Sequence, residues 1–232
     1  MEQTAVAPIT GISSMATRHV LAELASDYER NSDQRVAIES VGGVDAVRRV
    51  ECGEAFDFVV LAAQAIDKLA AAGHVDPRSR VAIARSGVAI AVPAGASRPD
   101  LGSEQAVRDA VVGARSIGYS TGPSGRHLAT LFERWGIAGI IAPRTVEAPP
   151  GVAVGSLVAR GDVAIGFQQL SELLHLPGID VVGTLPAEIQ QITLFCGASC
   201  LATARRDAAR GFLSYCASPK AEAVKRRHGM EP

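Results

Sequence analysis

Short apolar segments rich in β-branched residues alternate along the chain with segments whose apolar residues recur every three or four positions. The first pattern predicts buried strands and the second predicts amphipathic helices. Strands are expected at 5–12, 35–41 and 56–62, and helices at 15–32, 42–54 and 63–75. Because strands and helices alternate, we expect a largely parallel sheet whose strand ends and helix starts gather at one edge.

The run RVAIARSGVAIAVPAGA at 80–96 is long, extended and apolar, with a polar break at Arg85, Ser86 and Gly87. Such a run is typical of a segment that crosses between two lobes. The alternation then resumes, with helices expected at 103–112 and 122–137, a turn and helix at 149–161, and strands at 114–120, 139–147, 163–174 and 178–186. In 163–174 we expect the strand to run into a polar turn. A strand at 190–200 and two helices within 204–232 complete the expected elements.

The pattern therefore predicts an α/β fold of two similar lobes, each a mostly parallel sheet flanked by helices. We expect lobe I to comprise residues 1–85 and 190–232 and lobe II residues 86–189. Two segments would join the lobes as a hinge, with a ligand cleft between them. Proteins built in this way close around a small ligand.

Composition limits the possible partners. The 232 residues include 23 basic and 24 acidic side chains, for a net charge of −1, so no field attracts nucleic acid or a membrane surface. A charged ligand must therefore be met by local groups, and we expect a small-molecule anion. The four cysteines show no spacing typical of a metal site, and no dinucleotide or phosphate-loop motif occurs, so we expect no metal and no cofactor.

The first thirty residues have an acidic residue at position 2 and no basic segment followed by a long apolar core. They do not resemble a secretory signal, and no apolar run has the length of a membrane span. The sequence as written indicates a cytoplasmic protein. If a signal peptide precedes it in the native protein, the expectation changes to a periplasmic protein that serves an ABC transporter.

Small polar residues recur where an expected strand gives way to a helix. Backbone N–H groups at a helix start, together with nearby hydroxyls, can bind an anion. Parallel strands would bring these junctions to the same edge, so we take their residues as ligand-binding candidates: Ser13, Ser14, Gly42, Gly43, Tyr119, Ser120, Thr121, Gly122, Ser124, Gln168 and Gln169. Arg85 joins them, because a guanidinium can hold a carboxylate by two parallel hydrogen bonds.

Several stretches together resemble a known family. They are GISSMA, ESVGGVDAVRRVECGEAFDFVVLA, RSGVAIAV, YSTGPSGRHLATLFERWGI, GSLVARGDVAIGFQQLSELL and FCGASC with SPKAEAVKRRHGMEP. In this order they resemble the molybdate-binding-protein-like branch of the type 2 periplasmic substrate-binding proteins, over nearly the whole chain. The resemblance implies two α/β lobes, a hinge of two segments, and an anion held between the lobes by hydroxyls and backbone N–H groups.

The resemblance carries over to the site residues only in part. Ser14 stands where the family has its first ligand serine, and 121–124 stand near its helix-start donors. The Gly42-Gly43-Val44 turn replaces the second serine, and Gln168 or Gln169 replaces a late tyrosine. These replacements remove two hydroxyl donors that suit a tetrahedral oxyanion. The glutamines and Arg85 fit a flat organic di- or tricarboxylate better than molybdate.

Two functions remain open at this point. One is a hinged binding protein for a small carboxylate or oxyanion, which the many neutral donors favour. The other is a cytoplasmic isomerase that moves a proton and a double bond in an unsaturated polycarboxylate, since the same branch includes aconitate-isomerase-like proteins. Tyr119, Asp45 and Glu39 lie near predicted strand ends as candidate bases, and the sequence does not choose among them. A regulator's sensor domain would need a DNA-binding segment, which the sequence lacks.

Overall fold

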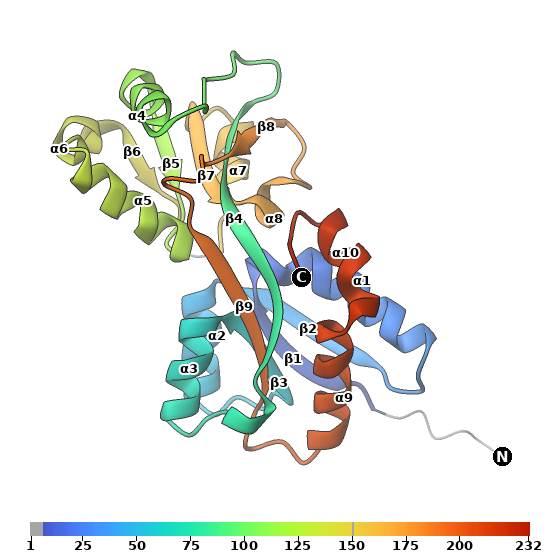
Figure 1. Cartoon of the computed structure of the whole chain (residues 1–232). Helices are drawn as coiled ribbons and strands as arrows, with labels where there is room; N and C mark the ends of the chain where they lie inside the picture. Colours follow the sequence, from blue (N-terminus) through green and yellow to red (C-terminus); the bar gives the residue numbers. More distant parts are fainter. Residues whose placement is uncertain (1–6, 150) are drawn as a thin grey trace. The chain divides into compact units, whose positions relative to one another are not determined.

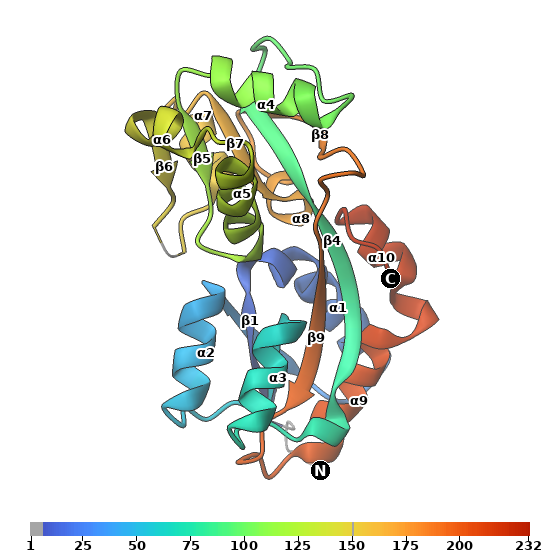
Figure 2. The same cartoon turned by 60° about the vertical axis from the view of Figure 1, so that its left-hand side comes forward.

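The structure is a computed structural model that describes residues 7–149 and 151–232. Strands β4 (Val81–Pro93) and β9 (Ile192–Ser199) run side by side and connect its two units (Figures 1 and 2). The first unit extends to Arg85 and resumes at Leu194, and the second is Ser86–Thr193. The chain therefore passes between the units twice, once within each of these strands.

The first unit is a sheet covered on both faces by helices. Its strands follow the order β2-β1-β3-β9; β1 is parallel to both neighbours, and β9 is antiparallel to β3. Besides β4 and β9, its elements are β1 (Ile9–Ser14), α1 (Arg18–Arg30), β2 (Val36–Val41), α2 (Gly43–Glu51), β3 (Phe58–Ala62), α3 (Ala63–Ala71), α9 (Arg206–Ala217) and α10 (Glu222–Arg227), with 3-10 turns at Met15–Thr17, Pro77–Ser79 and Pro219–Ala221.

Strand β3 shows why the first unit has two cores. Phe58 and Val60 pack with α1 and α9 on one face, whereas Val59 and Leu61 pack with α2 and α3 on the other. Alternate residues of a strand point to opposite faces, so a strand covered on both sides reads as a continuous apolar run. The sequence FVVLA at 58–62 meets this requirement, and its first four residues are buried as expected.

Asp57 fixes the end of the first unit's sheet where β1 and β3 begin. Its carboxylate accepts hydrogen bonds from the Thr10 backbone N–H at 2.7 Å and from the Thr203 hydroxyl at 2.5 Å. The Asp57 side chain is buried, and a buried carboxylate is tolerated only when hydrogen bonds replace the water it has lost. This cluster is a structural element at the opposite edge from the strand ends that precede the helices.

The second unit has a sheet in the order β4-β7-β5-β6, with β8 also paired to β4. Strands β7, β5 and β6 are parallel, and β4 is antiparallel to β7 and β8. Its elements are α4 (Glu104–Gly113), β5 (Ile117–Tyr119), α5 (Pro123–Arg134), α6 (Ala138–Ile141), a 3-10 turn at Ala142–Arg144, β6 (Thr145–Glu147), α7 (Val154–Ala159), β7 (Ile165–Gln169), α8 (Leu170–Leu173) and β8 (Ile179–Thr184). Helices α4, α5 and α6 share one core, and α7 lies in a separate one.

Two expected elements differ from the structure. The strand expected at 139–147 is wrong over most of its length, because α6 and a 3-10 turn occupy 138–144 and only Thr145–Glu147 is extended. Ile137 and Ile141, four residues apart, both enter the core, which favours helix over strand. The segment 163–174 is a strand only as far as Gln169, after which α8 begins.

The first strand begins later than expected. It was predicted at 5–12, of which residues 5 and 6 lie outside the described residues, and β1 runs from Ile9 to Ser14. Pro8 has no backbone N–H to donate to a neighbouring strand, which favours a start after it. Ser13 and Ser14 therefore end the strand, and Ser14 precedes the first 3-10 turn without a side-chain capping bond.

Candidate functional site

Hydroxyl side chains gather at the carboxyl ends of the parallel strands in the first unit. Ser13 of β1 is in register with Ser40 of β2, and their hydroxyl oxygens are 2.8 Å apart. Helix α2 begins two residues after β2 ends, with Gly42 and Gly43 at its start. We refer to Ser13, Ser14, Ser40, Gly42 and Gly43 as the first edge.

Ser14 is the residue of the first edge that indicates a ligand. Its side chain is only 8% exposed, and its Oγ has no hydrogen-bond partner among the described residues. It lies beside the start of α2, since a Cβ added to Gly43 would be 4.0 Å from the Ser14 Cβ. Gly42 at the N-cap of α2 offers no side chain to accept from the first helical N–H groups. An unpartnered buried hydroxyl is costly, and an uncapped helix start attracts anions, so both features fit an external acceptor.

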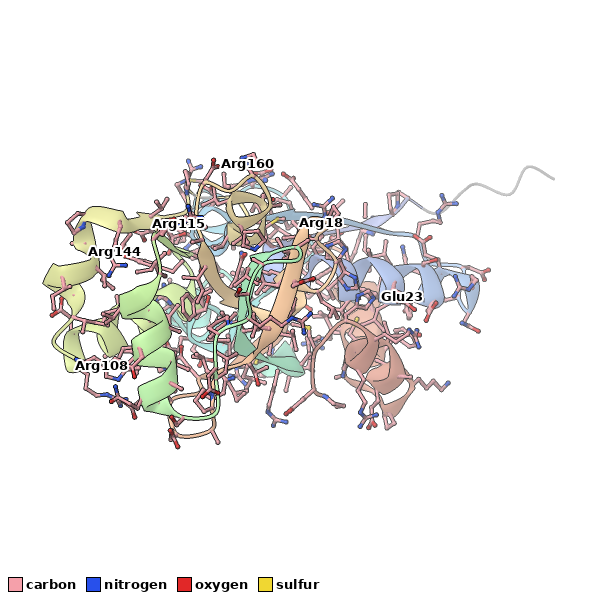
Figure 3. The ribbon with its side chains drawn as sticks, turned by 90° about the horizontal axis from the view of Figure 1, so that it is seen from above. Arg18, Glu23, Arg108, Arg115, Arg144 and Arg160 are labelled. Atoms are coloured by element: carbon pink, nitrogen blue, oxygen red, sulfur yellow. The ribbon has the colours of Figure 1, made fainter. Side chains whose placement is uncertain are left out.

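Arg18 supplies a cation near these hydroxyls. It begins α1 and is labelled in Figure 3, and it lines a hollow of about 590 Å³ between α1 and β2 together with Glu39 and Ser40. In the described part of the first unit it is the one arginine whose guanidinium has neither a hydrogen bond nor an ion pair. Because none of the residues that the structure describes pairs with its guanidinium, Arg18 is available to an anionic ligand.

The second unit has a comparable edge. Strands β5 and β7 are parallel with Tyr119 beside Phe167, so the following residues, Ser120 and Gln168, lie at neighbouring strand positions. Ser120 Oγ lies 3.0 Å from Ser124 Oγ and accepts a hydrogen bond from the Gly122 N–H at 3.3 Å. We refer to Ser120, Thr121, Gly122, Ser124, Gln168 and Glu172 as the second edge.

Gly125 explains why the turn of the second edge must contain glycine. A Cβ at this position would lie 1.5 Å from the carbonyl oxygen of Ser120. Only glycine lets the first turn of α5 approach the end of β5 so closely. Pro123 at the first helical position lacks an N–H and has a backbone angle suited to a helix start, so the remaining donors of α5 begin at Ser124.

Two buried glutamines end β7 and point to opposite faces. The Gln168 Oε1 accepts from the Val154 N–H at 2.8 Å, and its Nε2 donates to Glu172 Oε2 at 2.7 Å. The Gln169 Nε2 donates to Thr193 Oγ1 at 2.8 Å, while its Oε1 has no partner among the described residues. Gln168 therefore belongs to the second edge, and Gln169 is directed toward the start of β9.

Arg85 is placed apart from the other predicted ligand residues of the first unit. Its side chain is exposed, and Nη1 donates to the Pro232 carbonyl oxygen at 2.9 Å. Its backbone also pairs with Glu231. The guanidinium that the sequence assigns to a ligand carboxylate is thus engaged with the carboxyl-terminal segment, and Arg18 is the cation at the first edge.

The three candidate bases differ in their surroundings. Glu39 is exposed and accepts two hydrogen bonds from Arg49, at 2.5 and 2.8 Å, which lower the pKa of its carboxyl and weaken it as a base. Asp45 accepts from Arg48 at 3.1 Å in the first turn of α2. Burial, followed by the Glu147 carboxylate, raises the pKa of the Tyr119 phenol, so this group is protonated at neutral pH.

Sequence reasoning missed Glu172. Burial raises the pKa of its carboxyl to about 7, and the hydrogen bond from Gln168 offsets this only in part. Its carboxyl therefore titrates close to neutral pH, unlike those of the paired acids. A glutamate four residues after a strand-end glutamine was the available signal, but only a helix from Leu170 onward brings the two side chains together.

Two kinds of feature are missing from the described residues. Nowhere in 7–149 and 151–232 do three or more histidine, cysteine or acidic side chains form a group able to hold a metal ion. Over the same residues, every helix is too short or too polar to span a bilayer.

Comparison with known proteins identifies the family. The family model for the bacterial extracellular solute-binding proteins matches residues 9–231. The chain belongs to this family. It is 35% identical to an aconitate isomerase from a Pseudomonas species, over 98% of this chain and 88% of that protein.

Solved structures confirm the fold. The periplasmic molybdate-binding protein of Azotobacter vinelandii superposes with a TM-score of 0.80 at 22% identity, covering 97% of this chain and 99% of that one. The tungstate ABC transporter protein of Geobacter sulfurreducens gives a TM-score of 0.74 at 16% identity, covering 95% and 98%. The α/β fold of the type 2 periplasmic-binding class, and the resemblance to its molybdate-binding-like branch, are therefore confirmed.

Proposed function

We propose that this chain binds a small organic polycarboxylate and moves a proton and a double bond within it, as an aconitate-type isomerase. The observation that carries the proposal is the 35% identity to an aconitate isomerase along 98% of this chain. The similarity covers nearly the whole chain, so both edges lie within the stretch that it spans.

The hydrogen-bond donors of the first edge are suited to binding an anionic ligand. Ser14 provides a buried hydroxyl with no partner within the described residues, and α2 presents an uncapped start beside it. Arg18 adds a positive charge that no acidic side chain of the described chain neutralises. Hydroxyl, helix start and guanidinium together suit a carboxylate, because each donates hydrogen bonds to the charged form.

The second edge supports a second carboxylate group on the same ligand. The Ser120 and Ser124 hydroxyls and the start of α5 are neutral donors, and Gln168 follows on the adjacent strand. We propose that both edges contribute donors to one ligand. A polycarboxylate, with charged groups at both ends, matches two separate sets of donors.

The chemistry requires a base and stabilisation of charge. A base removes a proton from the carbon between the double bond and a carboxylate, and the proton returns at the other end of the three-carbon system. The negative charge that develops spreads onto the neighbouring carboxylate. Donors already aimed at that carboxylate stabilise the transition state more than the ground state.

A binding protein without chemistry is the second candidate, because the family is one of solute-binding proteins and its solved relatives include molybdate- and tungstate-binding members. In that case the same edges hold an anion unchanged. Gly42 and Gly43 offer no hydroxyl donor, which favours an organic carboxylate over a tetrahedral oxyanion.

A ligand screen followed by proton NMR tests the proposal. Purified protein is melted with cis-aconitate, trans-aconitate, citrate, molybdate, tungstate and sulfate, because a ligand that binds only the folded state raises the melting temperature. Each stabilising carboxylate is then incubated with protein in heavy water. We expect stabilisation by the aconitates and interconversion of the two isomers. Stabilisation without chemical change leaves the binding protein, and stabilisation by molybdate or tungstate alone contradicts the carboxylate proposal.

A further inference from the structure

The Gln168 side chain is held in one orientation by its two hydrogen bonds. A backbone N–H can only donate, so the Val154 N–H, 2.8 Å away, requires the amide oxygen of Gln168 on its side. The NH2 group must then face Glu172, where Nε2 donates to Oε2 at 2.7 Å. The amide thus fixes the position of one carboxyl oxygen relative to the rigid end of β7 and the start of α7.

The second oxygen of Glu172 remains open. Oε1 has no hydrogen-bond partner among the described residues, and Glu172 is only half-buried, so this oxygen is not fully enclosed by the protein. One oxygen is held and the other is accessible, at the end of a strand whose neighbour leads into the Ser120 turn. This is the geometry that a general base requires.

Burial and the hydrogen bond from Gln168 are the two influences that set the pKa of Glu172. The elements packed against α8 are α7, β7, β4 and β8. Helix α7 and strand β7 carry no titratable side chain. Arg85 of β4 donates to Pro232, and Asp180 of β8 accepts from Gly95 and lies 3.7 Å from Arg98. Nearby in sequence, Arg160 pairs with Asp162, and His175 is exposed. Burial, the larger influence, raises the pKa of Glu172 to about 7.

We propose that Glu172 is the catalytic base that carries the proton in the isomerisation, and that Gln168 is its positioning residue; this inference rests on the proposed function. The Glu172 carboxylate takes a proton from the methylene carbon of the ligand. The electrons of the broken C–H bond form the new double bond to the central carbon, and those of the old double bond move to the far carbon. The proton on Glu172 then forms a C–H bond at that carbon, which restores the carboxylate without any co-reactant.

The test compares variants of the proposed base and of its positioning residue with an unrelated surface variant. Wild type, Glu172→Gln, Gln168→Leu and Glu133→Gln are assayed with trans-aconitate by proton NMR in water and in heavy water across pH 5–9. Glu133 is an exposed glutamate on α5 with no role in either edge, so its variant is the matched control. Ligand binding is measured on the same samples by thermal shift.

Glu172→Gln should lower turnover at least about a hundredfold and abolish deuterium incorporation, while trans-aconitate still raises its melting temperature. Wild-type turnover should rise with pH to a plateau with a midpoint near 7. Gln168→Leu should move this midpoint upward, because the hydrogen bond from Gln168 lowers the pKa of Glu172. A purely structural role for Gln168 would leave the midpoint unchanged.

The outcomes separate the two proposals. If wild type isomerises trans-aconitate and Glu172→Gln turns over within threefold of it, Glu172 is not the base and the proposed function stands. If wild type neither binds nor isomerises the aconitates, the proposed function is wrong, and the assignment of Glu172 as the base is wrong as well. If Glu172→Gln does not fold, a wild-type pH profile without a midpoint between 6 and 8 still overturns the assignment.

Discussion

The Gln168 amide holds the Glu172 carboxyl through one hydrogen bond of 2.7 Å, and burial is the larger influence on the pKa of that carboxyl. The pKa of Glu172 in the folded protein, about 7, lies above the ordinary value of 4.5 that it returns to on unfolding. The folded state therefore binds the proton more tightly between these values. This contribution to stability is fully present below about pH 4.5 and is lost as the pH rises through 7.

Stability should consequently depend on pH through Glu172. We expect the free energy of unfolding of wild type, minus that of Glu172→Gln, to fall by at most about 1.4 kcal/mol per pH unit between pH 5 and 7. Above about pH 8.5 the difference should be constant. Urea unfolding at a series of pH values measures it, with Glu133→Gln as the control that shows no such slope. A flat difference for Glu172→Gln would mean that its carboxyl titrates at its ordinary pKa.

Ser14 and Ser13 are adjacent hydroxyls with opposite expected behaviour. Ser14→Ala removes a hydroxyl that has no partner, so the free energy of unfolding should change by less than about 0.5 kcal/mol. Its affinity for the ligand should fall about tenfold or more, because a hydrogen bond to a charged group is lost. Ser13→Ala breaks the contact with Ser40 and should cost about 1 kcal/mol of stability. Titration calorimetry and urea unfolding of both variants make the comparison. A destabilised Ser14→Ala with unchanged affinity would assign the hydroxyl a structural role.

Gly125→Ala should disrupt the second edge. The added methyl group would overlap the Ser120 carbonyl oxygen, so the start of α5 must move away from β5. We expect a loss of about 2 kcal/mol or more in stability and a weaker ligand-induced thermal shift. Gly139→Ala, in α6 with open space around the new methyl group, is the control and should be neutral or slightly stabilising. Equal stabilities for the two variants would show that the turn can relax without cost.

Asp57 provides a test that separates stability from binding. Asp57→Ala leaves the Thr10 N–H and the Thr203 hydroxyl without their acceptor, and should cost about 3 kcal/mol in the free energy of unfolding. Asp67 is exposed and accepts a hydrogen bond from Arg80, so Asp67→Ala should lower the free energy of unfolding by less than about 0.5 kcal/mol. Ligand affinity should stay unchanged in both variants. A large loss of affinity in Asp57→Ala would show that the two edges of the sheet are coupled.

Two arginines of the first unit can be compared directly. Arg18→Gln removes the unneutralised guanidinium near the first edge and should weaken binding of a polycarboxylate about tenfold, more at low salt than at high salt. Arg85→Gln removes a guanidinium that donates to Pro232, and we expect affinity within twofold of wild type. Isothermal titration at two salt concentrations distinguishes them. Weaker binding by Arg85→Gln, with unchanged binding by Arg18→Gln, would show that Arg85 binds the ligand, as the sequence predicts.

The sequence alone determined the α/β fold and its family. Apolar runs such as FVVLA indicate strands that are buried on both faces, and the amphipathic segments between them indicate the helices that pack on those faces. The sequence also indicated the strand-to-helix junctions, since serines and glycines at Ser13–Ser14, Gly42–Gly43 and Ser120–Gly125 have few other uses there. These are local signals, decided by spacing within a dozen residues.

Tertiary structure decided which side chains were left without partners. Ser13 and Ser14 are alike in sequence, but only packing gives Ser13 a partner in Ser40 and leaves Ser14 with none. The Arg85 guanidinium donates to Pro232, nearly 150 positions away, while Arg18 forms no ion pair with any residue that the structure describes. The pKa of Glu172 likewise depends on burial, and its contact with Gln168 depends on a four-residue helix that is too short to be predicted from apolar periodicity. Charge and hydrogen-bond satisfaction are sums over all neighbours, and neighbours distant in sequence are known only once the chain is folded.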